Sequence, residues 1–280
     1  MNLQPLQMDN RAAQQGGLEP LILAIARIFD GVAAERIEPL PGGTDARSFK
    51  LQIDGRYLVA KLPESRGGAI LAPRKQFDLS TRLAAAGLAP KPIAYDEATQ
   101  IQFVEMLHGY HSITMDMLRN SLILEPVVAL LQRLHSVEAS LRPFDPIAFA
   151  GTYLGKHRGE DLAAVNSRFE ELALIAEQDA AAWVGTSICH NDLHGANILL
   201  GASLQLIDFE YAVQAAPIVD LASFAAMNNL TTTQAQSLVR RYYGDQTAPF
   251  SAREFRNAMR VQQLLAELWK IARSNDNDLQ

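Results

Sequence analysis

The sequence is poor in cysteine, in net positive charge and in long apolar runs. Cys189 is the single cysteine among 280 residues, so an internal disulfide framework is excluded. Asp and Glu residues number 31 against 25 Lys and Arg residues, which gives a formal net charge of −6. A nucleic-acid-binding face normally needs an excess of basic residues, so the composition disfavours a nucleic-acid partner.

No apolar segment approaches the roughly 20 residues that a membrane-spanning helix needs. Residues 1–17 are polar and lack the apolar centre of a signal peptide. We therefore expect no membrane partner and a cytoplasmic location. Hydrophobic residues make up 48% of the chain, enough for a sizeable core. Nothing in the sequence indicates an oligomeric state.

The chain changes from strand-rich to helix-rich along its length. Residues 1–17 are Gln-rich and predict a flexible tail, and Asp54-Gly55 between alternating apolar runs predicts a hairpin. Two further strands are predicted within residues 93–107. Helices are predicted at residues 18–29, 74–86, 124–138, 161–183 and 251–274. We predict an α+β architecture with two lobes, residues 18–105 forming the first and residues 106–280 the second.

Acids and amides gather between two apolar segments in residues 188–212, ICHNDLHGANILLGASLQLIDFEYA. Carboxylates so close to buried strands need hydrogen bonds or a cation. Residues 198–207 predict a small hairpin that brings Asn197 and Asp208 to the same end. An amide oxygen and a carboxylate are ligands that Mg²⁺ accepts. Asp192, earlier in the loop, is placed to take a proton from an attacking hydroxyl, which is the arrangement of phosphoryl transfer.

The order His-x-Asp-x-x-x-x-Asn, followed by a strand that ends in Asp-Phe, resembles the kinase-like superfamily. Protein kinases are disfavoured: Asn191 replaces their Arg, Glu210 replaces the Gly of Asp-Phe-Gly, and no room is left for an activation loop. The stretch LIDFEYA…PIVDLA instead resembles the aminoglycoside phosphotransferase, choline/ethanolamine kinase and thiamine kinase group. The resemblance covers residues 38–243.

This resemblance implies a two-lobed protein-kinase-like fold that uses ATP and Mg²⁺. The first lobe would bind the nucleotide, and the second would carry the catalytic loop and the acceptor site. Asp192 would be the catalytic residue, with Asn197 and Asp208 as metal ligands. The implied ATP contacts are Lys61, Gly42 and Gly43 with Ser48 in the glycine-rich hairpin, and the hinge backbone at Glu105 and Met106.

Two positions depart from the family pattern. Ala46 stands where relatives often have Asn, so the phosphate grip would rest on backbone amides, Arg47 and Ser48. Many relatives pair the strand lysine with a Glu of the next helix, and this chain offers only Gln76 or Asp78. Asp78 is the candidate partner for Lys61, although some thiamine-kinase-like relatives lack this pair.

Four residues near the motif have supporting or substrate roles in this interpretation. His190 would orient the loop by hydrogen bonding, and Asp220 would tie it down. Glu210 and Tyr211 could hold a cationic acceptor by charge and cation–π contact, while a solvated Glu210 explains the sequence equally well. A zinc site at His190 and His194 is disfavoured because no third soft ligand is nearby.

The resulting expectation is an ATP-dependent phosphotransferase with a small, cationic, hydroxylated acceptor such as choline, ethanolamine or thiamine. An aminoglycoside or a sugar is the alternative acceptor, since a fold does not fix a substrate. A non-catalytic nucleotide-binding module is the alternative from another class. It is motivated by Ala46 and the missing helix Glu, and the intact Asp–Asn–Asp set argues against it.

Overall fold

The structure is a computed structural model, and it describes residues 7–8, 18–40, 46–63, 70–119, 123–154 and 162–277. The chain divides into two compact units, Met1–Tyr110 and His111–Gln280. The first unit is strand-rich and the second is mainly helical, which confirms the predicted α+β class. Each unit has its own buried core and is described by itself.

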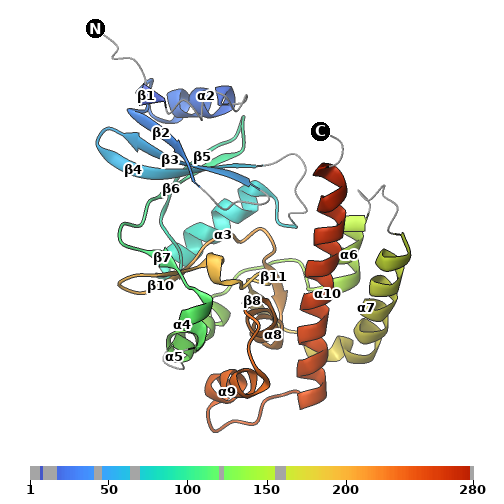
Figure 1. Ribbon diagram of the computed structural model, residues 1–280. Coiled ribbons are helices and arrows are strands. Elements are labelled where there is room, and N and C mark those ends of the chain that lie inside the picture. The colour runs from blue at the N-terminus through green and yellow to red at the C-terminus, as the bar shows by residue number, and fades with distance from the viewer. Residues whose placement is uncertain are drawn as a thin grey trace. The chain divides into compact units, whose positions relative to one another are not determined.

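Unit 1 is built on a sheet whose described strands follow the order β1-β2-β3-β4-β6-β5 (Figure 1). The strands are β1 (Gln7–Met8), β2 (Arg36–Pro39), β3 (Ala46–Ile53), β4 (Arg56–Pro63), β5 (Pro92–Asp96) and β6 (Ile101–Glu105). Asp54 and Gly55 close the β3–β4 hairpin with φ angles of 49° and 69°. Positive φ at both positions is what a two-residue type I′ turn requires, so the predicted hairpin is confirmed.

Part of the expected N-terminal tail is ordered in this sheet. Gln7–Met8 pair in parallel with Arg36 and Ile37 of β2, while the remaining neighbouring strands pair antiparallel. A two-residue strand satisfies backbone groups that the edge of β2 would otherwise expose. The other residues of the tail lie outside the described part of the chain.

Two helices cover the two faces of the unit 1 sheet, α2 (Glu19–Ile28) and α3 (Pro73–Ala85) (Figure 1). Leu21 and Ile25 of α2 belong to the same buried cluster as Leu51, Ala60 and Phe103 of the sheet. Alternate residues along β3 and β4 enter this cluster, which is the period-2 pattern expected of strands. The intervening residues, Lys61 among them, therefore lie on the opposite face.

Unit 2 consists of helices around two small sheets. The helices are α4 (Met115–Arg119), α5 (Leu124–His135), α6 (Pro146–Leu154), α7 (Leu162–Trp183), α8 (Ile218–Met227), α9 (Thr232–Tyr243) and α10 (Ala252–Asn277). Helix α8 is buried from Ile218 to Ala226, and α10 packs against α6, α7 and α8 (Figure 1). Because α8 is surrounded by protein, its polar residues need partners inside the core.

The short strands of unit 2 carry the motif found in the sequence. They are β7 (His111–Ser112), β8 (Ser187–Cys189), β9 (Ile198–Leu200), β10 (Leu204–Leu206) and β11 (Val213–Ala215), with a 3₁₀ turn at Gly195–Asn197. The orders are β10-β9-β7 and β11-β8. The β9–β10 hairpin pairs Ile198 with Leu206, which confirms the hairpin predicted over residues 198–207.

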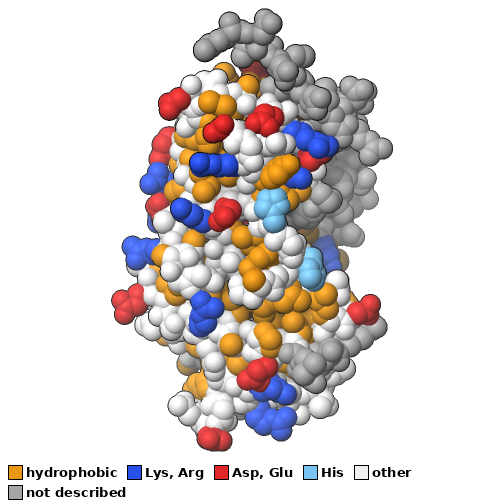
Figure 2. All heavy atoms as spheres, turned by 90° about the vertical axis from the view of Figure 1, so that its left-hand side faces the viewer, with side chains coloured by type: hydrophobic (Ala, Val, Ile, Leu, Met, Phe, Trp, Pro, Cys, Tyr) orange, Lys and Arg blue, Asp and Glu red, His pale blue; other side chains and the backbone are white. Residues whose placement is uncertain are grey.

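Neither the described helices nor the face seen in Figure 2 indicates a membrane or nucleic-acid partner. No described helix is both long and apolar enough to cross a membrane. On the face seen in Figure 2, acidic and basic side chains are interspersed with apolar ones, and the described residues there form no extended patch of one sign.

An ion pair between a half-exposed arginine and a buried aspartate joins α2 to β5 within unit 1. The side chain of Asp96 is 5% exposed, and its carboxylate accepts hydrogen bonds from Arg27 Nε and Nη2 at 2.9 and 2.7 Å. The backbone N–H and the hydroxyl of Thr99 also donate to it. The hydrogen bonds from Arg27 hold the pKa of Asp96 well below its ordinary value, although burial acts in the opposite direction.

We predict that Asp96→Asn destabilises the protein at pH 7 by about 2–3 kcal/mol, because a charged hydrogen-bond acceptor is lost from a buried position. A carboxyl group whose pKa is lowered on folding stabilises the protein above its unfolded pKa of about 4 and loses this effect as the pH falls further. The acid destabilisation of the wild type should therefore be smaller in Asp96→Asn. Urea unfolding at pH 7 and pH 3 measures both effects.

Glu97→Gln is the matched control, since the neighbouring Glu97 side chain is 70% exposed in its ion pair with Arg74. A surface pair of this kind contributes at most about 1 kcal/mol. Equal losses in the two variants at pH 7 would contradict the role assigned to Asp96.

Candidate active site

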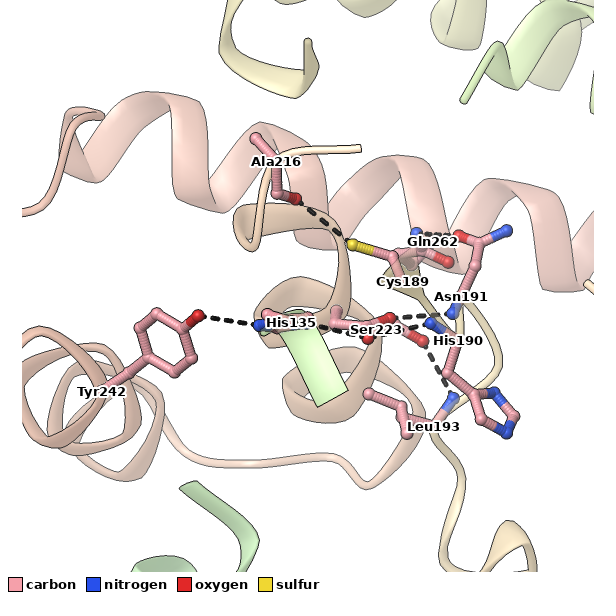
Figure 3. Close-up of polar contacts among 10 residues, drawn as sticks. His135, Cys189, His190, Asn191, Leu193, Ala216, Ser223, Tyr242 and Gln262 are labelled. Atoms are coloured by element: carbon pink, nitrogen blue, oxygen red, sulfur yellow. Dashed lines mark hydrogen bonds and ion pairs between the residues drawn. The ribbon is translucent and has the colours of Figure 1, made fainter. Parts of the chain in front are cut away.

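A buried carboxylate fixes the backbone of the loop that follows β8. Asp220 of α8 is fully buried, and it accepts hydrogen bonds from the backbone N–H groups of His190 and Asn191 at 2.9 and 2.8 Å. Figure 3 shows His190 and Asn191 side by side at this point. Asn191 has a φ of 62°, a left-handed conformation that Asn tolerates better than most residues. These are the contacts that the predicted supporting role of Asp220 requires.

Three further polar side chains from α8, its C-terminus and α10 hold the same loop. Leu193 N donates to Ser223 Oγ at 3.1 Å, and Asn228 Nδ2 donates to the Leu193 carbonyl at 2.7 Å. Gln262 Nε2 of α10 donates to Asn191 Oδ1 at 2.9 Å (Figure 3). These three residues were not predicted from the sequence. Each could have been recognised as a polar residue on an otherwise apolar helix face.

A second layer of contacts lies behind Asp220. His135 Nε2 is 3.1 Å from Asp220 Oδ2, and His135 Nδ1 is 2.7 Å from the Tyr242 hydroxyl (Figure 3). The ligand atoms of His135, Asp220 and Cys189 all lie within 4.8 Å of one another. Burial raises the pKa of the Cys189 thiol, and both oxygens of Asp220 already accept N–H donors. The cluster is therefore suited to positioning the loop rather than to binding a metal ion.

The carboxylate of Asp192 is held by Asn197 and His194. Asn197 Nδ2 donates to Asp192 Oδ2 and to the Asp192 carbonyl, both at 2.9 Å. His194 Nε2 lies 3.5 Å from Asp192 Oδ2. Burial raises the pKa of Asp192, but the hydrogen bond and charge of His194 outweigh it and lower the pKa below its ordinary value. Asp192 is consequently an ionised hydrogen-bond acceptor at neutral pH.

The β9–β10 hairpin brings Asn197 and Asp208 to the same end, as predicted. Ile207 N donates to the Asn197 carbonyl at 3.1 Å, so the residue just before Asp208 is bonded to Asn197. His190 Nε2 is 2.8 Å from the Ile207 carbonyl, and its ring packs on Phe209 with centroids 5.0 Å apart. Asp208 itself has a φ of 72°, an uncommon conformation for a non-glycine residue. His190 thus joins the catalytic loop to the segment that carries Asp208.

The oxygen atoms of Asn197 and Asp208 fit a hard cation. Nδ2 of Asn197 donates to Asp192, which leaves its Oδ1 without a hydrogen-bond partner among the described residues. An amide oxygen beside a carboxylate is a donor set that Mg²⁺ accepts. The His190–His194 pair does not indicate zinc, because among the described residues no group of three metal-ligating side chains includes either histidine.

Glu210 and Tyr211 are buried, with exposures of 6% and 7%. The alternative of a solvated Glu210 is therefore wrong. Burial lowers the pKa of His194, but Asp192, Asp208 and Glu210 raise it above its ordinary value. Three carboxylates thus favour the charged form of one imidazole, as they would favour another cation beside them.

In unit 1, Lys61 lies on the sheet face that meets α3. It is the cross-strand partner of Gln102, and Gln102 Nε2 is 3.4 Å from Gln76 Oε1 of α3. Gln76 is thus the α3 residue at the sheet beside Lys61. Asp78 is exposed and forms an ion pair with Arg74 at 3.1 Å. A Lys61–Asp78 pair stays a prediction.

The other predicted nucleotide contacts are distributed as follows. Ser48 of β3 lies directly opposite Lys61 of β4, so both belong to one sheet face. Gly42 and Gly43 lie outside the described residues, and so does the side chain of Arg47.

The predicted hinge already uses two of its backbone donors. Glu105 N donates to the Lys91 carbonyl at 2.8 Å, and Met106 N donates to the Tyr57 carbonyl at 3.3 Å. An adenine at this segment would therefore need donors other than these two N–H groups. The role of this segment as the hinge stays a prediction, and the sequence could not show which of its amides are engaged.

The chain is similar to known proteins both in sequence and in structure. Residues 36–256 match the sequence profile of the phosphotransferase enzyme family. The chain belongs to the phosphotransferase enzyme family. The match includes Lys61, the catalytic loop and the β9–β10 hairpin, and it confirms the resemblance inferred from the motifs. No curated protein sequence matches the chain significantly.

Solved structures show the same kinase-like fold at low sequence identity. Choline kinase LicA from Streptococcus pneumoniae has a TM-score of 0.78 and 19% identity, over 91% of this chain and 90% of that one. A choline/ethanolamine kinase family protein from Mesorhizobium loti has a TM-score of 0.70 and 21% identity, over 87% and 82%. A thermostable mutant of aminoglycoside phosphotransferase APH(4)-Ia has a TM-score of 0.63 and 17% identity, over 92% and 94%. These likenesses establish the two-lobed protein-kinase-like fold class.

We predict that the layer behind Asp220 contributes measurably to stability. His135→Ala removes a donor to a buried carboxylate and should lower the free energy of unfolding by about 2–3 kcal/mol. Tyr242→Phe removes one hydroxyl and should cost about 1 kcal/mol. The exposed His111 provides the control His111→Ala, with a change near zero. Chemical denaturation measures all three, and a His135→Ala variant as stable as His111→Ala would refute the assignment.

Proposed function

We propose that the protein is an ATP-dependent kinase that phosphorylates a hydroxyl group of a small cationic molecule of the choline, ethanolamine or thiamine type. The observation that carries this proposal is the Asp192 carboxylate, kept ionised by Asn197 and His194 in a loop fixed from α8. An ionised carboxylate with a fixed position is what a hydroxyl nucleophile needs as a proton acceptor.

The residues of the motif divide the tasks of this reaction. Asp192 accepts the hydrogen bond of the acceptor hydroxyl and then its proton. Asn197 orients Asp192 through Nδ2 and, with Asp208, would hold Mg²⁺. The bound ion neutralises phosphate charge in reactions of this class. Lys61 is the proposed contact of the ATP phosphates.

The relatives support nucleotide binding and the spacing of the aspartate and the asparagine. LicA has been solved in complex with AMP, and an APH(4)-Ia variant in a ternary complex with ADP and hygromycin B. Two solved APH(4)-Ia variants replace an aspartate and an asparagine that are five positions apart by alanine. Asp192 and Asn197 have the same separation in this chain.

The preference for a cationic acceptor rests on electrostatics. Asp192, Asp208 and Glu210 all raise the pKa of His194, and Glu210 is buried. A bound divalent ion offsets part of this negative charge, and a cationic acceptor would offset more of it. Aminoglycosides are cationic as well, so charge disfavours a neutral sugar but does not separate aminoglycosides from choline-type acceptors.

ADP release in the presence of MgATP should depend on one acceptor class from a panel of choline, ethanolamine, thiamine, aminoglycosides and neutral sugars. Asp192→Asn should lower kcat by roughly 10²–10⁴-fold, because the proton acceptor is lost while the shape is kept. ATP affinity, measured by calorimetry, should be unchanged.

Asp245→Asn is the matched control, since Asp245 is exposed. Near-normal turnover in Asp192→Asn would remove this residue from its assigned role. ATP binding without turnover on any acceptor would favour the alternative of a non-catalytic nucleotide-binding module.

Glu210→Gln separates the acceptor role of Glu210 from a general one. If Glu210 attracts the cation, the variant should raise KM for a cationic acceptor by about tenfold or more while KM for ATP stays unchanged. Equal changes in both KM values would assign Glu210 to the structure of the loop instead.

A further inference from the structure

A cavity of unit 2 lies between α9 and α10, apart from the residues of the candidate active site. We call it the α9–α10 cavity. It has a volume of about 520 Å³, within the range of roughly 300–1,000 Å³ found for small-molecule sites. None of Asp192, Asn197, Asp208 or Glu210 lines it. The residues that do so come from α9, from the segment that follows it and from the first half of α10.

The floor of the α9–α10 cavity is apolar and aromatic. Phe250 stacks on Phe255 with ring centroids 5.8 Å apart, and Tyr243 meets Phe250 edge-on at 5.7 Å. Val239 and Met259 add aliphatic and thioether surface. Such a floor favours the hydrocarbon part of a ligand.

The charged residues of the α9–α10 cavity all have one sign. Arg240, Arg256 and Arg260 line it, and its lining contains no acidic residue. Arg260 is neutralised by bonds to Glu171 and Glu267. Arg240 and Arg256 are exposed, and within the described part of the chain their side chains form no ion pair. Two uncompensated guanidinium groups therefore border an apolar floor.

We propose that the α9–α10 cavity binds a small amphipathic anion, of the class of alkyl or aryl carboxylates. The hydrocarbon part lies on the aromatic floor, and the carboxylate pairs with Arg240 and Arg256. A cationic acceptor of the proposed reaction is repelled here, so this is a separate site. The inference does not depend on the proposed function.

Decanoate, below its micelle-forming concentration, is the probe. Calorimetric titration should give saturable 1:1 binding that weakens as salt concentration rises. Decanol should bind more weakly, and decyltrimethylammonium should not bind at the site. These two compounds keep the alkyl chain and change only the charge, so they separate charge recognition from adsorption to apolar surface.

Two variants locate the binding. Arg256→Glu should weaken decanoate binding by about tenfold or more, because a charge-assisted hydrogen bond is replaced by repulsion. Lys270→Glu makes the same charge change at an exposed position of α10 outside the cavity and should leave the affinity unchanged. Val239→Trp fills the cavity without changing its charge and should also weaken binding.

Circular dichroism and thermal unfolding check that each variant is folded. Loss of binding in Arg256→Glu and Val239→Trp, with binding retained in Lys270→Glu, supports the proposal. Absence of saturable binding to the wild type overturns it, and so does equal binding of decanoate and decyltrimethylammonium. Binding that both cavity variants leave unchanged overturns it as well.

Discussion

The carboxylate of Asp220 is the group on which the arrangement of the candidate active site depends. It is fully buried and accepts N–H donors from His190, Asn191 and His135. A buried carboxylate with these partners is stabilised, whereas removal of the donors would leave an uncompensated charge in the core. The cost of breaking this arrangement keeps the loop backbone in one conformation. The position of Asp192, two residues along the chain, follows from it.

Amide side chains extend this fixation from Asp220 to Asp192. Asn191 is held by Gln262 of α10, and Asn197 donates to Asp192 through the nitrogen that cannot bind a cation. An amide has a donor end and an acceptor end, so these hydrogen bonds define its orientation. A hydroxyl or a carboxylate, with equivalent acceptor positions, would not be oriented in this way. The result is a set of groups whose geometry is in place before any substrate arrives, the condition for electrostatic catalysis.

Sequence patterns predicted the local part of the structure well. The Asp54-Gly55 hairpin, the β9–β10 hairpin and the Asp–Asn–Asp order depend on residues near one another in the chain. Two expectations failed or stayed open for the same physical reason. The burial of Glu210 depends on the segments around it, and the side chain of α3 at the sheet beside Lys61 is Gln76 rather than Asp78. Helix periodicity shows that a face is buried but not which neighbour it meets.

The fold class and the family could be predicted from the sequence, because turn preferences, apolar periodicity and motif spacing are local properties. The long-range contacts that hold the loop after β8 could not be predicted in this way. His135 reaches Asp220 across 85 positions and Gln262 reaches Asn191 across 71. The α9–α10 cavity, with its two uncompensated arginines, likewise exists only where two helices pack. Such partners are selected by packing and by the need to satisfy buried polar groups, and no short stretch of sequence records them.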